Sequence, residues 1–329
     1  ATALAAGGPG ALFWMWLAAL FGMATKYSEC LLAIHYREVQ ADGHILGGPF
    51  FTIEKGMGKK WKWLAILFAF FGTLVGLFGI GTFSQINGIT SAVSNFFDPN
   101  KLSTVTLFGN SYSWAVVISG ILIALFAGLV IVGGLKRISK VAQIIVPFMA
   151  ALYLLIGLVI IFTNLPKIPA AFAEIFKGAF GLKAAAGGMM GAMIVAMQKG
   201  IARGIFSNEA GLGSAPIAAS AAKVTEPVQQ GLVSMTGTFI DTIVICSITG
   251  LAIVIAGSWN IEGLQGVMIT SDAFVKTLPF LPVSFVRFVL MVCLVFFAFT
   301  TILGWDYYSE RCIEYMSNGK MGIGKTYRW

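Results

Sequence analysis

Two adjacent hydroxyls in a long apolar run are the first residues that could bind an ion. Thr300 and Thr301 lie in FFAFTTILGW, about one helical turn after Phe297. In a helix, these two hydroxyls and the Phe297 carbonyl would offer hard oxygen ligands that suit sodium. A Thr in a membrane helix most often hydrogen-bonds its own i−4 carbonyl. The pattern therefore predicts a candidate sodium site, with ordinary back-bonding as the alternative.

A carboxylate lies deep in another apolar run. Asp241 stands in TFIDTIV, and an acid near the middle of a membrane costs at least about 2.5–3.5 kcal/mol. Asp241 is therefore a candidate ion or proton site. Its alternative role is structural, as a partner of Thr242, Gln198 or Lys199.

A glycine-rich stretch, AAAGGMMGAMIV, lies where a span is expected to reach the bilayer midplane. It carries Gly187, Gly188 and Gly191 within a few residues. Glycine has poor helix propensity, and an opened helix would present carbonyls and amides to a small ligand, as broken helices do in transporters. Close helix packing through small residues is the alternative.

Two amides and a polar junction also interrupt apolar sequence. Gln85 and Asn87 lie two residues apart in FSQINGITS, so they point to different faces of one helix. Because a buried amide costs several kcal/mol unless it is paired, one could face a cavity and the other a neighbouring helix, or both could join helices. Further along, the polar segment SNEAGLGSAP at 207–216 indicates a packed junction, which is either a gate or a helix terminus.

Three charged residues within or beside the apolar runs are given structural roles. Lys26 and Glu29 lie three residues apart and are expected to pair with each other. Arg287 lies near the end of its apolar run, where its guanidinium can snorkel to the membrane surface.

The composition excludes a soluble protein. Of the 329 residues, 57% are hydrophobic and 11% are charged, and the mean hydropathy is +0.85, whereas soluble domains carry about 25% charged residues. The chain should be a polytopic α-helical protein of the lipid bilayer. Its net charge of +8 comes from Lys and Arg in short connections, which is a topology signal and no sign of nucleic-acid binding.

Enzyme chemistry finds little support in the sequence. His35 and His44 both lie in the first connection and lack partners at metal-ligand spacing. Ser214 in GLGSAP has no histidine in any span to activate it, and no phosphate-binding glycine loop is present. The four cysteines show no paired spacing, so small buried thiols are expected rather than disulfides.

Seven apolar stretches are long enough to cross the hydrocarbon core, which takes about 20 helical residues. They lie at roughly 11–35, 63–95, 113–134, 141–163, 184–206, 229–256 and 283–305, within a single transmembrane domain over 1–329. The second is too long for one straight crossing, so it should tilt or project beyond the interface. Between the fourth and fifth, PKIPAAFAEIFKGAFG is expected to form an amphipathic helix at the membrane surface.

The distribution of basic residues predicts an orientation. Most of the 22 Lys and Arg fall in or near the connections after the first, third, fifth and seventh stretches. Because cytoplasmic loops are enriched in Lys and Arg, the chain should begin outside the cell membrane and end inside.

Several phrases resemble the alanine/glycine:cation symporter family. They are GGPGALFWMW and FGMATKYSE within 7–29, GGPFF at 47–51, and above all GIARGIFSNEAGLGSAPIA at 200–218. TFIDTIV and FTTILGWDYYSER fit the same pattern, and the resemblance covers essentially the whole chain.

The resemblance implies a LeuT-type fold of the APC superfamily, with two inverted repeats of five helices and the substrate beside the unwound centre of the first helix of each repeat. This chain would then hold core helices 2–8 and be truncated at both ends. The first core helix and helices 9 and 10 are expected in the full-length chain, where the first helix would supply half of the binding site. We expect no transport from these residues alone.

The resemblance also implies residue roles. Thr300, Thr301 and the Phe297 carbonyl would bind sodium, and the glycine-rich stretch would be an unwound sixth helix. The implied substrate contacts are Gln85, Asn87, Gly187, Gly188, Gly191, Ala192, Met193 and Ile194.

Together these observations predict sodium-coupled uptake of a small neutral amino acid, alanine or glycine, by alternating access across the cytoplasmic membrane. No cofactor is expected besides the coupling ion, and proton coupling through Asp241 is an alternative. A passive channel and a non-transporting membrane scaffold are the other interpretations.

Overall fold

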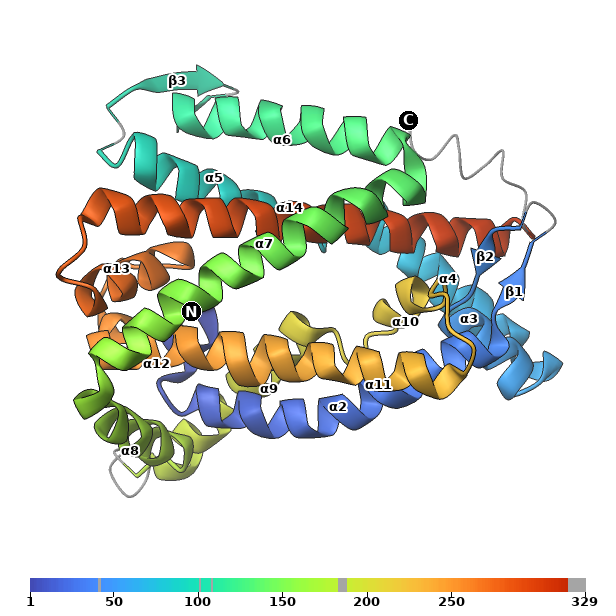
Figure 1. The fold of residues 1–329 in the computed structure, drawn as a ribbon, viewed down its shortest axis with the longest axis horizontal. Helices are drawn as coiled ribbons and strands as arrows, with labels where there is room; N and C mark the ends of the chain where they lie inside the picture. Colours follow the sequence, from blue (N-terminus) through green and yellow to red (C-terminus); the bar gives the residue numbers. More distant parts are fainter. Residues whose placement is uncertain (41–42, 101, 108, 183–187, 319–329) are drawn as a thin grey trace.

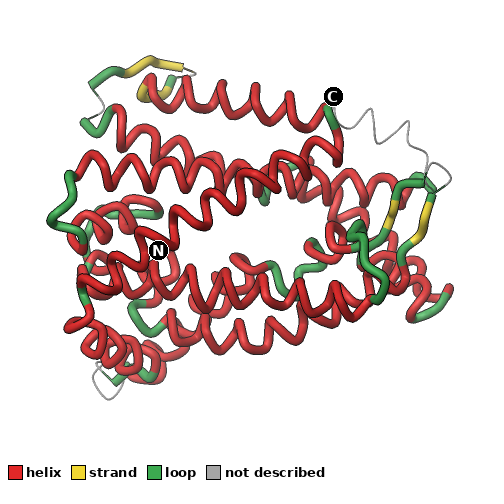
Figure 2. The backbone as a smooth tube through the Cα atoms, viewed as in Figure 1, coloured by secondary structure: helices red, strands yellow, loops and turns green. Residues whose placement is uncertain are grey.

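The computed structural model describes all residues except 41–42, 101, 108, 183–187 and 319–329. Helices make up most of the described chain, and short strands occur only in two hairpins at opposite ends of the helix bundle (Figure 2). The first hairpin pairs β1 with β2 and the second pairs β3 with β4, both antiparallel. The strands are β1 (Glu38–Val39), β2 (Ile45–Leu46), β3 (Thr104–Leu107) and β4 (Asn110–Ser113).

The helices form two layers that lie one above the other in Figure 1. In the upper layer, α14 packs against α4, α5 and α7, and α6 covers α5. This layer consists of α4 (Lys62–Leu77), α5 (Phe83–Phe97), α6 (Trp114–Val132) and α14 (Val283–Met316), and α7 (Gly134–Thr163) runs obliquely from it to α12. In the lower layer, α2 packs against α9 and α11. It consists of α1 (Thr2–Gly7), α2 (Ala11–Tyr36), α9 (Met189–Asn208), α11 (Pro227–Thr238) and α12 (Cys246–Ala256).

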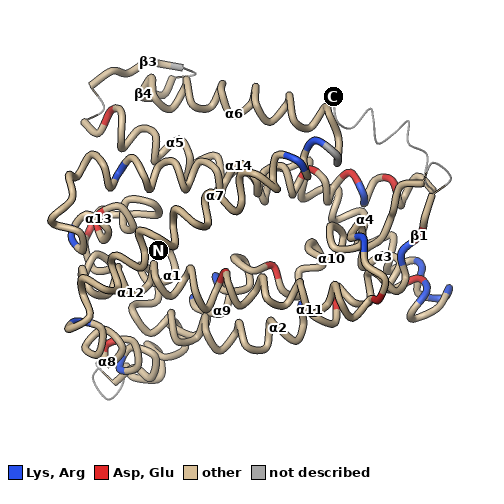
Figure 3. The backbone as a smooth tube through the Cα atoms, in the orientation of Figure 1, with Lys and Arg blue, Asp and Glu red and all other residues tan. Residues whose placement is uncertain are grey.

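Short elements close the two ends of the bundle. At one end lie α8 (Ile168–Ala179), α13 (Val267–Thr277) and the β3–β4 hairpin; at the other lie α3 (Pro49–Phe51), α10 (Ala215–Ala219) and the β1–β2 hairpin. Single turns connect several helices, at Thr52–Gly56, Lys59–Trp61, Leu165–Lys167 and Ser258–Asn260. Figure 3 shows many of the Lys and Arg residues at the end that carries β1 and α3.

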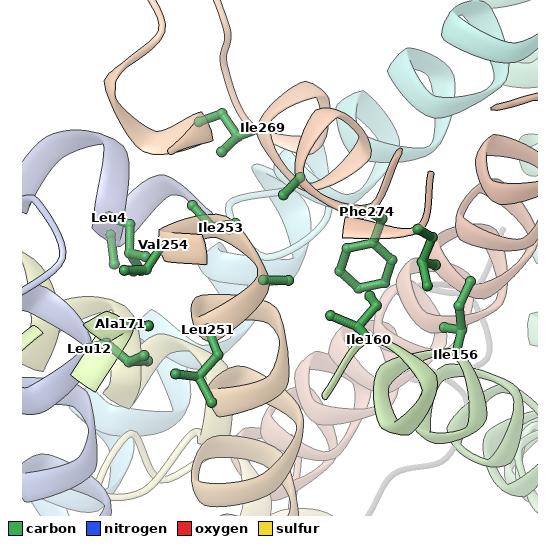
Figure 4. Packing of buried hydrophobic residues seen from close by; sticks show 14 of the residues in the cluster. Leu4, Leu12, Ile156, Ile160, Ala171, Leu251, Ile253, Val254, Ile269 and Phe274 are labelled. Carbon is green, nitrogen blue, oxygen red and sulfur yellow. The ribbon is translucent and has the colours of Figure 1, made fainter. Parts of the chain in front are cut away.

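The largest hydrophobic core joins the two layers near α13. It is built by side chains of α1, α2, α7, α8, α12, α13 and α14, among which Leu12, Ile160, Ile253 and Phe274 are almost fully buried (Figure 4). Elsewhere the helix surfaces are strongly apolar: Ile121, which is 63% exposed, and Leu125 and Leu129, each 54% exposed, lie on α6. Such side chains suit a surface that lipid covers.

Six helical stretches in the described part of the chain are long and apolar enough to cross a membrane. They are Ala11–Tyr36, Lys59–Leu77, Trp114–Val132, Arg137–Thr163, Pro227–Ala256 and Val283–Met316. They confirm a multi-pass membrane protein. The fifth predicted span corresponds to α9, which is not among these six stretches. The α9 helix carries Gln198, Lys199 and Arg203, which make it more polar than the six.

The second predicted span is wrong as a single long helix. The structure ends α4 at Leu77 and begins α5 at Phe83. Gly79 lies between them at φ +63°, a backbone conformation that glycine adopts without strain. Gly81 lies so close to the Trp305 ring of α14 that a Cβ atom there would overlap with it. The break is therefore set by a close approach to a distant helix.

The helix expected before α9 is present as α8, while its position at the membrane surface stays a prediction. Its aromatic side chains turn toward α2: the ring centroids of Phe13 and Phe176 lie 5.5 Å apart, and those of Trp16 and Phe172 lie 5.8 Å apart. The Trp14 indole donates to the Ala179 carbonyl at 3.1 Å. Because α8 is bound to α2 in this way, it closes one end of the bundle.

Candidate functional site

The three predicted sodium ligands converge on one turn of α14. The hydroxyl of Thr300 donates to the Phe297 carbonyl at 2.9 Å, and the hydroxyl of Thr301 donates to the same carbonyl at 3.0 Å. Both threonines are half-buried. Each hydroxyl therefore bonds to a carbonyl of its own helix, which was the alternative expected from the sequence. This arrangement holds the two hydroxyl oxygens and the carbonyl oxygen close together. Rotation of the two hydroxyl hydrogens would direct oxygen lone pairs toward a cation.

The α5 helix lies alongside this turn of α14. Ile89 packs in one cluster with Ala298 and Ile302, and Gly81 lies against Trp305. Gln85 precedes Ile89 by one helical turn on α5. Gln85 is half-buried, whereas Asn87 is exposed, which agrees with their expected positions on different faces.

The glycine-rich stretch differs from its expectation. Met189 through Ile194 are helical, so the predicted unwinding of these residues is wrong, while Gly187 lies outside the described residues and Gly188 is the N-cap of α9. A Cβ atom at Gly191 would meet nothing within 4 Å, so no close packing requires this glycine. The remaining candidates on this turn are Ala192, Met193 and Ile194, of which Ala192 and Ile194 are exposed.

Further along the helix, α9 packs closely against α2. A Cβ atom at Gly200 would lie 2.8 Å from the Trp14 Cβ atom, and Gly204 faces Met15 one turn later. This spacing of small residues lets α9 approach α2 closely. The main partners of α9 are α1, α2 and α8, and those of α5 are α14 and α6. The structure therefore does not bring the two halves of the predicted substrate site together.

Asp241 lies in a hydrogen-bonded network between α9 and the helix that follows α11. The hydroxyls of Ser207 and Thr242 donate to Asp241 Oδ2 at 2.7 and 2.9 Å. The Asn208 amide donates to Thr242 Oγ1 at 3.0 Å. Thr242 was one of the expected partners, whereas Ser207, 34 residues away, was missed. The segment Phe239–Ile245 is a π-helical turn, a local widening that is frequent at functional sites.

A buried lysine holds the C-terminus of α9. Lys26 Nζ donates to the carbonyl of Asn208 at 2.8 Å and lies 3.8 Å from Glu29 Oε1. The predicted pairing of Lys26 with Glu29 is thus confirmed, and Glu29 Oε2 also accepts the backbone N–H of Gly211 at 3.2 Å. A cation at a helix C-terminus is favourable because the last carbonyls carry partial negative charge.

The polar segment after α9 is a packed junction, as expected. Glu209 ends the helix in the left-handed conformation with φ +56°. Its Oε2 accepts the Ser214 hydroxyl at 2.7 Å and the Tyr308 hydroxyl of α14 at 3.4 Å. A Cβ atom at Gly213 would lie 2.8 Å from the Phe68 ring. This junction ties the lower layer, which carries Asp241, to the upper layer, which carries the threonines.

Sequence reasoning missed a second buried polar cluster near the β1–β2 hairpin. Arg311 contacts Glu310 Oε1 at 2.5 Å and Glu314 Oε2 at 2.6 Å, and His44 also contacts Glu314. The spacing of Arg311 and Glu314, three residues apart at the end of an apolar run, is the signal that could have found it. The cluster anchors the first connection to α14.

Comparison with known sequences identifies the family. A sequence model of the sodium:alanine symporter family matches residues 1–329. The chain belongs to that family. Its members are symporters and not enzymes, so this chain is a multi-pass membrane protein of a transporter family.

Individual relatives agree with this membership. An uncharacterized transporter of Haemophilus influenzae is 51% identical over 329 residues, which are 100% of this chain and 67% of that protein. The sodium/alanine symporter AgcS of Methanococcus maripaludis is 46% identical over 100% of this chain and 68% of its own length. The putative sodium/proton-dependent alanine carrier protein YrbD of Bacillus subtilis is 39% identical over 97% of this chain and 63% of its own length. The chain thus spans about two thirds of the length of these relatives.

Proposed function

We propose that the protein is a sodium-coupled symporter of a small neutral amino acid, alanine or glycine, in the cytoplasmic membrane. The observation that carries the proposal is the convergence of three oxygen atoms on one turn of α14, in a chain of the sodium:alanine symporter family. The end of the bundle with β1, α3 and many Lys and Arg residues would face the cytoplasm. The helices would correspond to core helices 2–8 of a LeuT-type fold with inverted repeats.

The proposed sodium site consists of the Phe297 carbonyl and the hydroxyls of Thr300 and Thr301. All three ligands are uncharged oxygen atoms, which suit a hard cation. Because none of them is a carboxylate, they suit a monovalent cation better than a divalent one. Further ligands would come from a helix outside this chain. Asp241 is a second candidate ion or proton site, because two hydroxyls, those of Ser207 and Thr242, hold its carboxylate between α9 and the helix that follows α11.

The proposed amino-acid site lies between α5 and the start of α9. Gln85 and Asn87 would contact the substrate from α5. The first N–H groups of α9, near Gly188 and Gly191, have no partner within the helix, so they suit the substrate carboxylate. The neighbouring Ala192, Met193 and Ile194 would limit the size of the substrate side chain.

Alternating access would then bring these two halves together and separate them again. In the structure described above, α5 belongs to the layer of α14 and α9 belongs to the layer of α2. Sodium can drive uptake only if it binds one arrangement of the layers more tightly than the other. We propose that sodium on α14 favours the arrangement in which the amino-acid site is complete.

The test is uptake of radiolabelled alanine and glycine by the full protein in proteoliposomes. An inward sodium gradient should raise the initial rate and allow accumulation above the external concentration, whereas a potassium gradient should not. Equilibration without accumulation in both gradients would indicate a passive channel. Rates equal to those of empty liposomes in every gradient would indicate a scaffold. Either of these results would contradict the proposal.

A further inference from the structure

An open hollow lies at the end of the bundle that carries the β1–β2 hairpin, where many of the Lys and Arg residues gather (Figure 3). It has a volume of about 590 Å³, within the range of about 300–1,000 Å³ that is usual for ligand sites. Its walls come from the hairpin, α3, the turns before α4, the start of α4 and the end of α14. We call it the hairpin pocket, and its lining residues include Glu38, Gln40, Glu54, Lys55, Lys59 and Lys62.

The charges of the hairpin pocket leave one ammonium group in excess. Lys55 Nζ lies 2.8 Å from Glu38 Oε1, and Lys62 Nζ lies 2.9 Å from Glu54 Oε1. Lys59 lines the same pocket and is exposed, and it has no ion pair among the residues that the structure describes. The pocket therefore has a surplus positive charge that is free to bind an anion.

The hairpin pocket opens where a membrane span begins. The stretch Lys59–Leu77 is one of the six that are long and apolar enough to cross a membrane. Trp61 and Trp63 lie at its start, and both are exposed, with ring centroids 6.3 Å apart in a stacked arrangement. Exposed tryptophans at the end of a span are typical of the boundary between hydrocarbon and lipid headgroups. The pocket therefore lies at the depth of the headgroups.

The exposed face of α4 continues from this boundary toward the middle of the membrane. Leu67, Phe70 and Phe71 are exposed and follow Trp63 by about one and two helical turns, so they lie on the same face. Ala69, which is fully buried, belongs to the opposite face, which packs against α14. A lipid chain that lies along the exposed face would leave its headgroup beside the hairpin pocket.

We propose that the hairpin pocket is a specific site for an anionic phospholipid of the surrounding membrane, such as phosphatidylglycerol. The Lys59 ammonium would bind the phosphodiester, and the acyl chains would lie along the exposed face of α4. Lys60, which is also exposed, would add to the positive potential at the pocket mouth. Clusters of four or more basic residues directly beside a span are typical of segments that bind anionic lipids, and 55–62 contains four lysines.

Other ligand classes fit the hairpin pocket less well. Phosphatidylcholine brings its own ammonium group, so a surplus positive charge gives it no net attraction. A nucleotide with several phosphates would need more unpaired cations than the one ammonium that the described residues place in the pocket. A free inorganic anion would make no use of the apolar face of α4. The proposal concerns lipid binding, so it stands or falls independently of transport.

The experiment measures stepwise lipid binding to the full protein in detergent micelles by native mass spectrometry. The probe is palmitoyl-oleoyl phosphatidylglycerol, and phosphatidylcholine with the same chains is the lipid control. The first phosphatidylglycerol should bind about fivefold or more tighter than phosphatidylcholine, because each lysine near the membrane surface contributes about that factor. Lys59→Gln should remove this preference and leave phosphatidylcholine binding unchanged, and Lys59→Arg should keep the preference. Lys223→Gln, which removes an exposed lysine outside the pocket, should also keep it.

A second variant tests the pocket without removing a lysine. Gln40 follows β1 and lines the pocket, so the nearly isosteric Gln40→Glu would neutralise the surplus charge. The preference for phosphatidylglycerol should again be lost. Gln229→Glu is the matched control, because Gln229 is an exposed residue of α11 outside the pocket, and it should behave like the wild type.

Four outcomes would overturn the proposal. The first is equal binding of the two lipids by the wild type. The second is an unchanged preference for phosphatidylglycerol in Lys59→Gln or in Gln40→Glu. The third is an equal loss of preference in Lys223→Gln or Gln229→Glu, because the effect would then come from surface charge in general. The fourth is displacement of phosphatidylglycerol by inorganic phosphate at the same concentration, because the ligand would then be a free anion and not a lipid.

Discussion

Replacing Lys26 by methionine should release the C-terminus of α9. Lys26 is 7% exposed, and its ammonium lies 2.8 Å from the Asn208 carbonyl and 3.8 Å from Glu29. Removal of one partner from a buried ion pair costs about 3–5 kcal/mol, because the other charge stays buried without compensation. Glu29 still accepts a hydrogen bond from the Gly211 N–H. We therefore expect a loss of unfolding free energy at the lower end of this range, about 3 kcal/mol.

A double-mutant cycle separates the energy of the Lys26–Glu29 pair from that of the hydrogen bond between Lys26 and the Asn208 carbonyl. Glu29→Gln in the Lys26→Met background removes the remaining charge, so the double variant should recover stability relative to Lys26→Met. The remaining loss should be about 1–2 kcal/mol, because the Asn208 carbonyl has lost its donor. The coupling energy between the two sites should lie within the usual range of about 0.5–3 kcal/mol for residues in contact.

The measurement is the free energy of unfolding of the full protein in mixed micelles, from titration with dodecyl sulfate and tryptophan fluorescence. Lys223→Met is the matched control, because Lys223 is exposed and surface substitutions change stability by about 0.5 kcal/mol or less. The account is contradicted if Lys26→Met lowers the free energy of unfolding no more than Lys223→Met does. It is also contradicted if the loss in the double variant equals the sum of the losses in the two single variants.

Two further predictions concern the ends of the bundle. Gly10→Ala should destabilise the protein by about 1–3 kcal/mol, because its Cβ atom would overlap with the backbone of Ala179; Gly191→Ala, in open space, should be neutral or stabilising by up to about 1 kcal/mol. Equal melting temperatures for the two variants would be inconsistent with the close contact between α8 and the start of α2. The Ser113 hydroxyl holds the pKa of Asp98 below its ordinary value of 3.8. Ionised Asp98 therefore stabilises the β3–β4 hairpin above pH 3.8. This stabilisation is lost as the pH falls through the lower pKa of the folded state. The difference in melting temperature between wild type and Asp98→Asn should therefore shrink from pH 7 to pH 3, and a constant difference would argue against a charge-assisted bond.

Features that depend on local sequence could be predicted. The span expected at 113–134 is the helix Trp114–Val132, because an unbroken apolar run in lipid must satisfy its own backbone hydrogen bonds. The pairing of Lys26 with Glu29 follows from helical spacing alone. The turn with Thr300 and Thr301 was also predictable, since these residues follow Phe297 by three and four positions, which is one turn of the same helix.

Features that depend on distant contacts could not be predicted. The break between α4 and α5 arises where Gly81 meets Trp305, and nothing within the 63–95 run indicates that contact. Ser207 reaches Asp241 only because α9 lies against the helix after α11. The close contact of Gly200 with α2 likewise joins segments far apart in the chain. Arg287 lines a pocket that five separate helices build.

The central claim is that the α14 oxygens bind the coupling ion, and the double substitution Thr300→Val and Thr301→Val tests it most directly. Each change is nearly isosteric and removes one hydroxyl that donates to the Phe297 carbonyl. Thr73→Val is the matched control, because its hydroxyl makes the same kind of bond to the Ala69 carbonyl on α4. In proteoliposomes, the double variant should lose the stimulation of alanine uptake by a sodium gradient, while Thr73→Val should keep it. Sodium-stimulated uptake by the double variant at the wild-type rate would contradict the account.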